Sequence, residues 1–283
     1  MDNNTNNGIE NITILVHGGL CNRLDAVMFG IALLKKYRLG GGKIRVLWEK
    51  THDCRAYYDE LFEPIALDGI RVERPEALHL RHSRPRNLRL PSLLRRLTFD
   101  KCYDGGSLTA STVDAIIRHE RRVFIESYRN PLDSFIEPTL YSLFKPIADI
   151  RQKIEQTTRT FAPGTIGVHI RRTDHADSIR ESPLPAFFKL MDDEIRTMPS
   201  RMFYVASDDS NVRRDMVQRY GSRIISPRRE LSRGTVGGMQ DAVAELFCLA
   251  STDKIIGSSR STYSIDAARM RNIPLLIVTD GTA

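Results

Sequence analysis

The chain has 283 residues, of which 41% are hydrophobic and 27% are charged, as is ordinary for a globular protein. Its formal net charge is +7, and no apolar run approaches the roughly eighteen residues that a membrane-spanning helix needs. The first seven residues are polar, so a secretory signal is not expected there. The four cysteines lack metal-ligand spacing, which argues against a zinc site and a disulfide framework and favours a reducing, cytoplasmic location.

The first half of the chain opens with a strand, a glycine-containing turn, a helix and a second strand. This order predicts the beginning of a parallel α/β sheet. The glycines at 40–42 are expected to end the first helix, and the sequence becomes less regular after the second strand. The predicted strands are 11–16, 44–48 and 122–126, and the predicted helical segments are 22–37 and 138–160, the latter broken near Pro146.

The second half alternates more regularly between strands and helices, which indicates a doubly wound α/β domain. The predicted strands are 165–170, 202–206, 223–225, 254–256 and 274–278, and the predicted helices are 185–197, 209–220, 239–251 and 262–271. We therefore expect two Rossmann-like halves with a cleft between them, over residues 1–150 and 151–283.

Arginines are concentrated in an insertion at residues 79–101 of the first half. Such a run can bind nucleic acid, an acidic membrane surface or an anionic substrate, or it can be a solvated insertion. Interleaved leucines favour partial docking on the protein, and the lack of aromatic side chains between the arginines disfavours single-stranded nucleic acid. Nucleic acid is therefore not an expected partner, whereas peripheral association with the inner face of a membrane is compatible with the charge. The arginines are Arg81, Arg84, Arg86, Arg89, Arg95 and Arg96.

Three segments follow predicted strands and suit a phosphate group. In open α/β sheets ligands bind beyond the carboxyl ends of the strands. The first segment, 17–23, has glycines that let the backbone approach a pyrophosphate, although a tight turn explains them equally well. It has neither the spacing of a dinucleotide fingerprint nor the lysine of a P-loop. The third segment, 257–264, offers hydroxyls and free amides at the start of a helix.

The second segment, 168–174, reads Val-His-Ile-Arg-Arg-Thr-Asp. Two arginines and a histidine at the end of a strand are costly unless an anion or a carboxylate meets them. The planar fork of arginine donates two hydrogen bonds at once, which suits phosphate, and Arg171 is the expected donor. For Arg172 we expect a structural pairing with Asp174 or another carboxylate.

These segments, taken together in order, resemble the fucosyltransferase superfamily that contains the α1,6-, α1,2- and protein O-fucosyltransferases. The bacterial nodulation-type α1,6 enzymes are the most similar, because their central motif also reads His-x-Arg-Arg-Thr-Asp. The resemblance spans most of the chain outside the arginine-rich insertion. It is carried by residues 18–23, 46–49, 59–64, 169–174, 203–208 and 245–264.

The resemblance implies a GT-B-like fold of two Rossmann-like domains and an inverting transfer of fucose from GDP-fucose to a glycan or peptide. It also implies that residues 1–150 form the acceptor side and that residues 151–283 bind the nucleotide sugar. It implies no metal and no cofactor beyond the donor substrate. Arg171 would hold the β-phosphate, His169 would line the nucleotide site, and Glu245 stands where the family usually has an aspartate that contacts guanine. The implied donor-binding residues are Gly18, Gly19, Asn22, His169, Arg171, Glu245, Ser261 and Thr262, and Cys21 replaces a usual glycine of the first loop.

The general base is left open among the side chains that follow the central strand, and Asp174 is equally suited to orienting Arg172 or capping the loop. The acidic pair Asp208-Asp209 is interpreted as a helix N-cap rather than a metal site. The alternatives are a transferase of another nucleotide sugar, a basic nucleic-acid-binding protein, and a sulfotransferase, which the absence of a P-loop disfavours. The candidate bases are Asp174, His175, Asp177 and Glu181.

Overall fold

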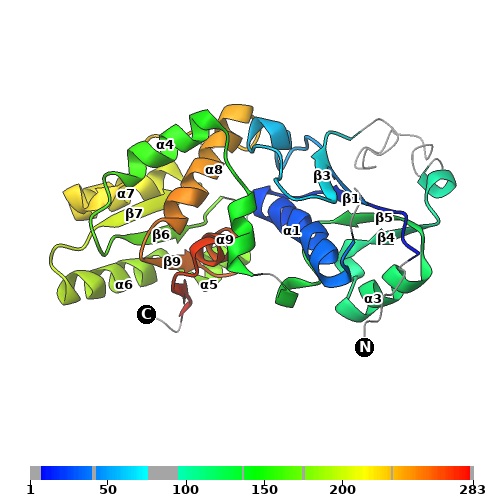
Figure 1. Cartoon of the computed structure of the whole chain (residues 1–283). Helices are drawn as coiled ribbons and strands as arrows, with labels where there is room; N and C mark the ends of the chain where they lie inside the picture. Colours follow the sequence, from blue (N-terminus) through cyan, green and yellow to red (C-terminus); the bar gives the residue numbers. More distant parts are fainter. Residues whose placement is uncertain are drawn as a thin grey trace. The chain divides into compact units, whose positions relative to one another are not determined.

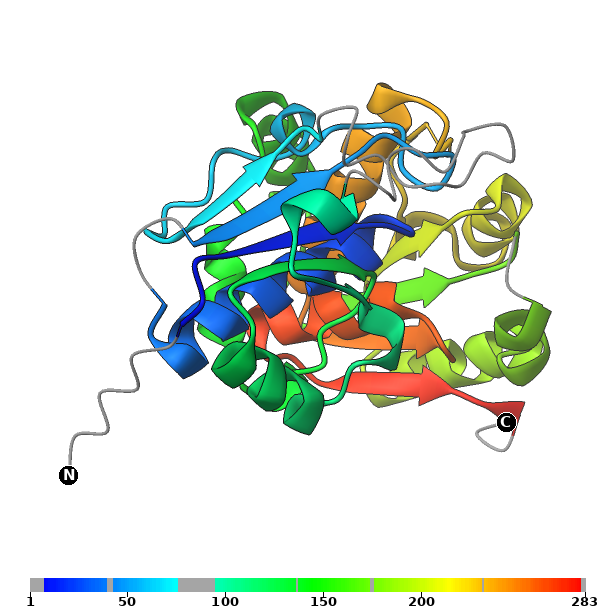
Figure 2. The ribbon, with the colours of Figure 1, turned by 90° about the vertical axis from the view of Figure 1, so that its right-hand side faces the viewer.

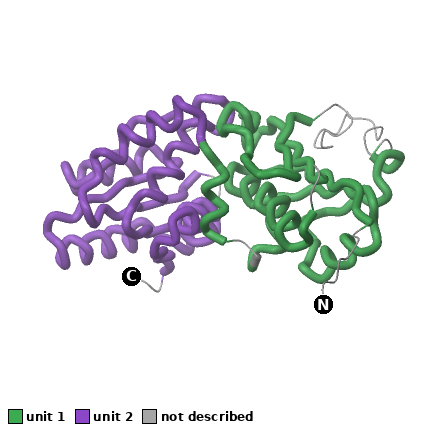
Figure 3. Tube along the Cα trace, viewed as in Figure 1, with its two compact units in different colours: residues 1–145 green, residues 146–283 purple. Residues whose placement is uncertain are grey.

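The computed structural model describes residues 8–39, 43–75, 95–135, 137–173, 176–230 and 232–280. The chain forms two compact units, residues 1–145 and 146–283, which Figure 3 shows in different colours. Each unit is built on a wholly parallel five-stranded sheet, and the strands of the first unit run in the same direction in Figure 2. The predicted α/β class with two Rossmann-like halves is confirmed. The unit boundary falls between Lys145 and Pro146, a few residues before the predicted one.

Unit 1 has the strand order β3-β2-β1-β5-β4 (Figure 1). Its strands are β1 (Asn11–Val16), β2 (Ile44–Trp48), β3 (Ile70–Glu73), β4 (Lys101–Asp104) and β5 (Arg122–Ser127). Its α-helices include α1 (Leu20–Tyr37) and α3 (Ala110–His119), and its 3-10 turns include η1 (Tyr58–Glu60), η3 (Gly105–Ser107), η4 (Asp133–Phe135) and η5 (Pro138–Leu143). Strands β3 and β4 were not predicted, because short edge strands carry little periodic signal. Helix α3 was also not predicted.

Helix α1 is apolar along most of its circumference, which is typical of a helix enclosed by its own unit. Almost every side chain between Leu20 and Leu34 is buried. The helix ends at Tyr37, and Arg38 then adopts a left-handed conformation with φ 51°. The predicted glycine stop is therefore wrong in detail, since the left-handed turn precedes residues 40–42, which lie outside the described part of the chain.

Unit 2 has the strand order β10-β9-β6-β7-β8. Its strands are β6 (Ile166–Ile170), β7 (Phe203–Ser207), β8 (Ile224–Ile225), β9 (Lys254–Ser258) and β10 (Leu275–Val278). Its helices are α4 (Ala148–Thr158), α5 (Ala176–Glu181), α6 (Leu184–Thr197), α7 (Ser210–Tyr220), α8 (Val236–Ala250) and α9 (Thr262–Arg271), and Gly221–Arg223 forms the 3-10 turn η6. Among these, only the short helix α5 and the turn η6 were not predicted.

The two faces of the second sheet are packed differently. One face carries an apolar cluster in which Val168, Val205 and Ile256 pack with side chains of α6 and α7. On the other face β9 lies very close to α9, because a Cβ added at Gly257 would come within 2.5 Å of the Ser264 hydroxyl. Side chains alternate along a strand, so His169 lies on this second face, next to α9. No described helix is both long and apolar enough to cross a membrane.

Candidate functional site

The candidate site lies at the carboxyl ends of β6 and β9. In the second sheet the chain passes from β6 to β7 and β8 on one side, whereas β9 and β10 lie on the other. Neighbouring strands β6 and β9 therefore flank the point where the strand order reverses, and open parallel sheets bind ligands there. The loops that leave this point contain two of the three segments that the sequence singled out.

Hydrogen bonds tie these two loops to each other. The hydroxyl of Ser258 accepts from the backbone amide of Arg171 at 3.0 Å and donates to the carbonyl of His169 at 3.3 Å. The amide of Ser259 donates to the hydroxyl of Ser182 at 2.8 Å, and this hydroxyl donates to the carbonyl of Val278. The loops after β6 and β9 are therefore held in one fixed arrangement.

Ser261 is the N-cap residue of α9, but its side chain makes no capping hydrogen bond. The residue is only 3% exposed, and within the described part of the chain its hydroxyl has no hydrogen-bond partner. The first amides of a helix also lack acceptors within the helix. A buried hydroxyl at the start of a helix is a candidate site for an anion, because the hydroxyl and the helix amides supply donors where the helix dipole is positive.

His169 contacts the first turn of α9 through two side chains of that helix, Ser264 and Tyr263. Its Nδ1 atom lies 2.7 Å from the hydroxyl of Ser264, and its ring stacks on Tyr263 at 4.8 Å between ring centroids and an interplanar angle of 30°. The pKa of His169 is lowered from 6.5 to about 3, chiefly by burial; Asp208 opposes this shift and Arg171 adds to it. The imidazole is therefore neutral near pH 7, and its contacts with Ser264 and Tyr263 position the start of α9.

Arg172 binds backbone carbonyls rather than a carboxylate. Its guanidinium donates to the carbonyls of Arg171 at 3.0 Å and Ser182 at 2.8 Å, and it lies 5.8 Å from the ring centroid of Phe187. The structural role expected for this arginine is therefore filled, but by carbonyls at the carboxyl end of the strand. Burial lowers the pKa of Arg172, and the nearby Asp208 opposes that shift.

The acidic pair after β7 has two separate structural roles. Asp208 accepts hydrogen bonds from the amide of Arg172 at 2.7 Å and from the amide and hydroxyl of Thr173, so it fixes the turn after β6. Asp209 caps α7 by accepting from the amide of Asn211, which confirms the N-cap interpretation for this residue. The described residues contain no group of three or more metal-ligating side chains of the His, Cys, Asp or Glu type.

Glu245 and Arg213 form an ion pair beside this site. The Arg213 Nη1 atom lies 2.7 Å from Glu245 Oε1, and the arginine also donates to the carbonyl of Ser207 at the end of β7. Burial raises the pKa of Glu245, and Arg213 counteracts the shift. No role for Arg213 was predicted from the sequence. Its position in the first turn of α7, the helix that follows β7, is the feature that could have indicated a place near the site.

Of the two candidate bases that the described residues include, Glu181 is held more firmly. Its Oε2 atom accepts from the hydroxyl of Ser259 at 2.7 Å and from Arg260 Nε at 3.0 Å, and its Oε1 atom lies 2.7 Å from Arg260 Nη2. These hydrogen bonds lower the pKa of Glu181. Asp177 pairs with Arg180 at 2.6 Å. Asp174 and His175 lie outside the described residues.

The glycine loop of unit 1 occupies the corresponding point of the first sheet, between β1 and β5. The amide of His17 donates to the carbonyl of Ser127 at 3.1 Å. Gly18 adopts φ 83°, a conformation that favours glycine, and a Cβ at this position would lie 3.0 Å from the side-chain Nδ2 atom of Asn22. Gly19 is the N-cap residue of α1, and because glycine has no side chain it cannot cap the helix with one. The donor-binding role of this loop stays a prediction.

Arg23, which the sequence analysis did not select, fixes that loop from inside unit 1. It is fully buried and donates to the carbonyl of Gly18 at 2.7 Å, the carbonyl of Glu49 at 2.6 Å and the hydroxyl of Thr51 at 2.7 Å. Its guanidinium also lies 5.3 Å from the ring centroid of Trp48. The sequence pattern around an arginine does not show whether that arginine is buried or exposed, so the role of Arg23 could not be predicted.

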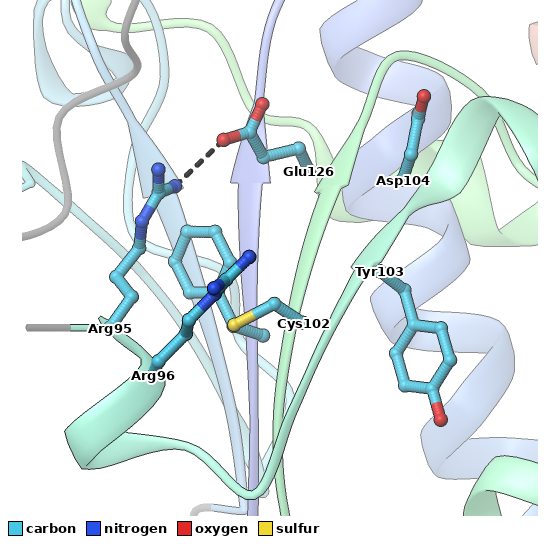
Figure 4. A pocket seen from close by; sticks show the side chains of 7 residues that line it. Arg95, Arg96, Cys102, Tyr103, Asp104 and Glu126 are labelled. Carbon is cyan, nitrogen blue, oxygen red and sulfur yellow. Dashed lines mark hydrogen bonds and ion pairs between the residues drawn. The ribbon is translucent and has the colours of Figure 1, made fainter. Parts of the chain in front are cut away.

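A hollow of about 250 Å³ lies in unit 1 beside β4 and β5 (Figure 4). Figure 4 shows Arg95 reaching toward Glu126, and the two side chains form an ion pair at 2.7 Å. Arg95 also lies 4.7 Å from the ring centroid of Phe124, so this arginine docks on the sheet. Arg81, Arg84, Arg86 and Arg89 lie outside the described residues. The hollow is lined by Arg95, Arg96, Cys102, Tyr103, Asp104, Phe124 and Glu126.

Comparisons with known proteins bear on the fold. No family model matches the sequence, and a search of curated proteins gives no match. Among solved structures, the chain is similar to NodZ α1,6-fucosyltransferase soaked with GDP-fucose, with 16% identity, 96% of each chain covered and a TM-score of 0.60. A NodZ structure from Bradyrhizobium has 16% identity, coverage of 91% and 92%, and a TM-score of 0.57.

Two further solved structures, of FUT1 and POFUT1, are also similar to the chain. FUT1 of Arabidopsis thaliana in complex with GDP has 14% identity and a TM-score of 0.58, over 94% of this chain and 70% of that one. POFUT1 in complex with GDP has 11% identity and a TM-score of 0.57, over 95% and 98%. The chain therefore has the GT-B-type fold of these fucosyltransferases, as its sequence motifs predicted.

Proposed function

We propose that this chain is a glycosyltransferase that moves fucose from GDP-fucose to a hydroxyl of a glycan or peptide acceptor, with inversion and without a metal ion. The observation that carries the proposal is the buried hydroxyl of Ser261, which has no hydrogen-bond partner among the described residues and lies at the start of α9, next to the strand that delivers Arg171. The likeness in fold to proteins whose structures contain GDP or GDP-fucose supports the choice of donor.

In this proposal the diphosphate binds at the carboxyl ends of β6 and β9. The first amides of α9 and the hydroxyls of Ser261 and Thr262 donate to its oxygens. Arg171 binds the β-phosphate, where negative charge accumulates as the bond between the sugar and GDP breaks through an oxocarbenium-like state. His169 acts through Ser264 and Tyr263, which it holds at the start of the helix.

The acceptor hydroxyl must lose a proton as it attacks. We assign this step to the segment after β6, to Asp174 or His175, because both follow the strand that carries Arg171. Glu181 is less suited, since both of its carboxylate oxygens are already engaged by Ser259 and Arg260. Binding of the acceptor is assigned to unit 1.

Guanine recognition is assigned to Glu245, the position that the sequence motif aligns with the guanine-contacting aspartate. A transferase of another nucleotide sugar is the second candidate function, because Glu245 is committed to an ion pair with Arg213. A nucleic-acid-binding function is favoured by no described contact, and Arg95 of the basic segment pairs with Glu126.

Thermal unfolding in the presence of nucleotides tests the proposal. A ligand that binds only the folded protein at a hundredfold excess over its dissociation constant contributes about 2.7 kcal/mol to stability, which raises the melting temperature measurably. We expect GDP to raise the melting temperature and UDP, ADP and CMP to have little effect. Stabilisation by UDP and not by GDP would exclude GDP-fucose as the donor and select the second candidate.

A further inference from the structure

The loop between β9 and α9 contains a residue in an unusual backbone conformation. Arg260 has φ 56°, in the left-handed region that glycine adopts freely and arginine does not. It lies between the buried residues Ser259 and Ser261, directly before the first turn of α9. Because a left-handed non-glycine residue costs free energy, surrounding contacts must hold it.

Those contacts come from α5, chiefly from its last residue, Glu181, while Asp177 Oδ2 also lies 3.5 Å from Arg260 Nη1. The carboxylate of Glu181 engages the Arg260 guanidinium through both oxygens, with Nε at 3.0 Å from Oε2 and Nη2 at 2.7 Å from Oε1. The same carboxylate accepts from the hydroxyl of Ser259 at 2.7 Å. One side chain thus grips two consecutive residues of the loop. The next residue along the chain, Ser182, accepts from the amide of Ser259.

We propose that Glu181 is a positioning residue, which clamps Arg260 in the left-handed conformation and so holds the start of α9 in the shape that receives a diphosphate. This inference rests on the proposed function and assigns Glu181 a place in donor binding. It also links the segment after β6 to the loop after β9, so that one carboxylate sets the geometry of both walls of the phosphate site.

The geometry distinguishes this role from that of a general base. A base must direct a lone pair at the acceptor hydroxyl, whereas contacts from Arg260 and Ser259 occupy most of the lone-pair positions of the Glu181 carboxylate. The side chains of Glu181 and Arg260 are 28% and 55% exposed, so the pair lies at the protein surface. Its loss should therefore leave the fold intact.

The test compares alanine and glycine at Arg260, because glycine adopts the left-handed conformation without a clamp. We expect Glu181→Ala and Arg260→Ala each to weaken GDP binding by about five- to thirty-fold. Without the clamp, residue 260 leaves the left-handed conformation most of the time, so a smaller fraction of the protein has the loop shape that binds GDP. Arg260→Gly should bind GDP much more tightly than Arg260→Ala. In the Arg260→Gly background, Glu181→Ala should add little, because the clamp then has nothing to hold.

Two controls accompany these variants. Arg38 has the same residue type and a similar left-handed conformation, φ 51°, at the end of α1 in the other unit. Arg38→Gly should change stability without changing GDP affinity. Arg196→Ala removes an exposed ion pair with Asp193 on α6 and should also leave GDP affinity unchanged. Binding is measured by isothermal titration calorimetry with GDP and, separately, with inorganic pyrophosphate.

The clamp acts on the diphosphate, so GDP and pyrophosphate should weaken by the same factor in Glu181→Ala. If Arg260→Gly binds GDP as poorly as Arg260→Ala, or if Glu181→Ala binds both probes like the parent, the clamp is overturned. A fall in turnover in Glu181→Ala with unchanged GDP affinity would make Glu181 a base instead. If the unsubstituted chain binds neither probe, the proposed function itself fails.

Discussion

Arg213 and Glu245 form a buried ion pair at the carboxyl edge of the second sheet, with Arg213 Nη1 2.7 Å from Glu245 Oε1 and Nη2 2.9 Å from Oε2. The arginine also donates to the carbonyl of Ser207, so it connects β7 to α8 through the carboxylate. A glutamate side chain is long enough to reach this arginine from α8. The residue that the sequence motif assigns to guanine is thus also a structural partner.

Glu245→Gln is expected to destabilise the protein. The substitution leaves the charge of Arg213 buried without its counter-ion, and breaking a buried pair in this way typically costs about 3–5 kcal/mol. The free energy of unfolding, measured by urea titration, should fall accordingly. The double variant Arg213→Met/Glu245→Leu removes both charges and should regain most of the loss. An unchanged free energy of unfolding in Glu245→Gln would show that the pair contributes nothing.

Arg171→Ala is expected to lower turnover rather than to unfold the protein. Removing a preorganised donor to a developing oxyanion costs on the order of a hundred- to a thousand-fold in turnover. Turnover is measured as GDP release from GDP-fucose in the presence of acceptor. Arg214→Ala, which removes an exposed arginine bonded to Asn211 on α7, is the matched control. Parental turnover in Arg171→Ala would disprove the role of this arginine.

Ser261→Ala is expected to separate binding from stability. The hydroxyl is buried and, among the described residues, makes no hydrogen bond, so its removal should leave the melting temperature unchanged or raise it. GDP affinity should fall by about five- to tenfold, as for the loss of one hydrogen bond of roughly 1 kcal/mol.

Ser251→Ala is the control for that experiment, because Ser251 donates to the carbonyl of Phe247 within α8 and lies at the far end of the helix. This variant should lose stability and keep its GDP affinity. The anion site at α9 would be contradicted if Ser261→Ala kept parental GDP affinity.

The pH dependence of stability should carry a component from His169. Its folded-state pKa is lowered to about 3, so between that value and the unfolded value of 6.5 the unfolded chain binds a proton that the folded chain does not. Stability from this group is therefore full above pH 6.5 and is lost as the pH falls toward 3. His169→Asn removes the titrating group and keeps a polar partner for Ser264.

The measurement compares the free energies of unfolding of the parent and His169→Asn by urea titration at several pH values. The advantage of the parent should shrink steadily as the pH decreases from 6.5. A constant difference between the two proteins across this range would mean that His169 titrates at its ordinary pKa.

The sequence alone determined most of the architecture of unit 2 and the location of the site. Strands β1 and β2 and helix α9 have the predicted bounds, because each combines an uninterrupted period of apolar residues with clear ends. The segments at 168–174 and 257–264 were placed at strand ends by the same reasoning. The edge strands β3 and β4 were not found, because a four-residue strand that is half exposed leaves no periodic pattern.

Only the tertiary structure decided what the individual polar side chains do. Within the described residues, which do not include its expected partner Asp174, Arg172 binds two backbone carbonyls. Glu181, a candidate base in the sequence, is engaged by Arg260 79 residues later in the chain. Arg23 and Arg213 gained their roles from groups that are distant in sequence. Hydrophobic periodicity is a local property of the chain, whereas the partner of a buried charge depends on which strands and helices the fold brings together.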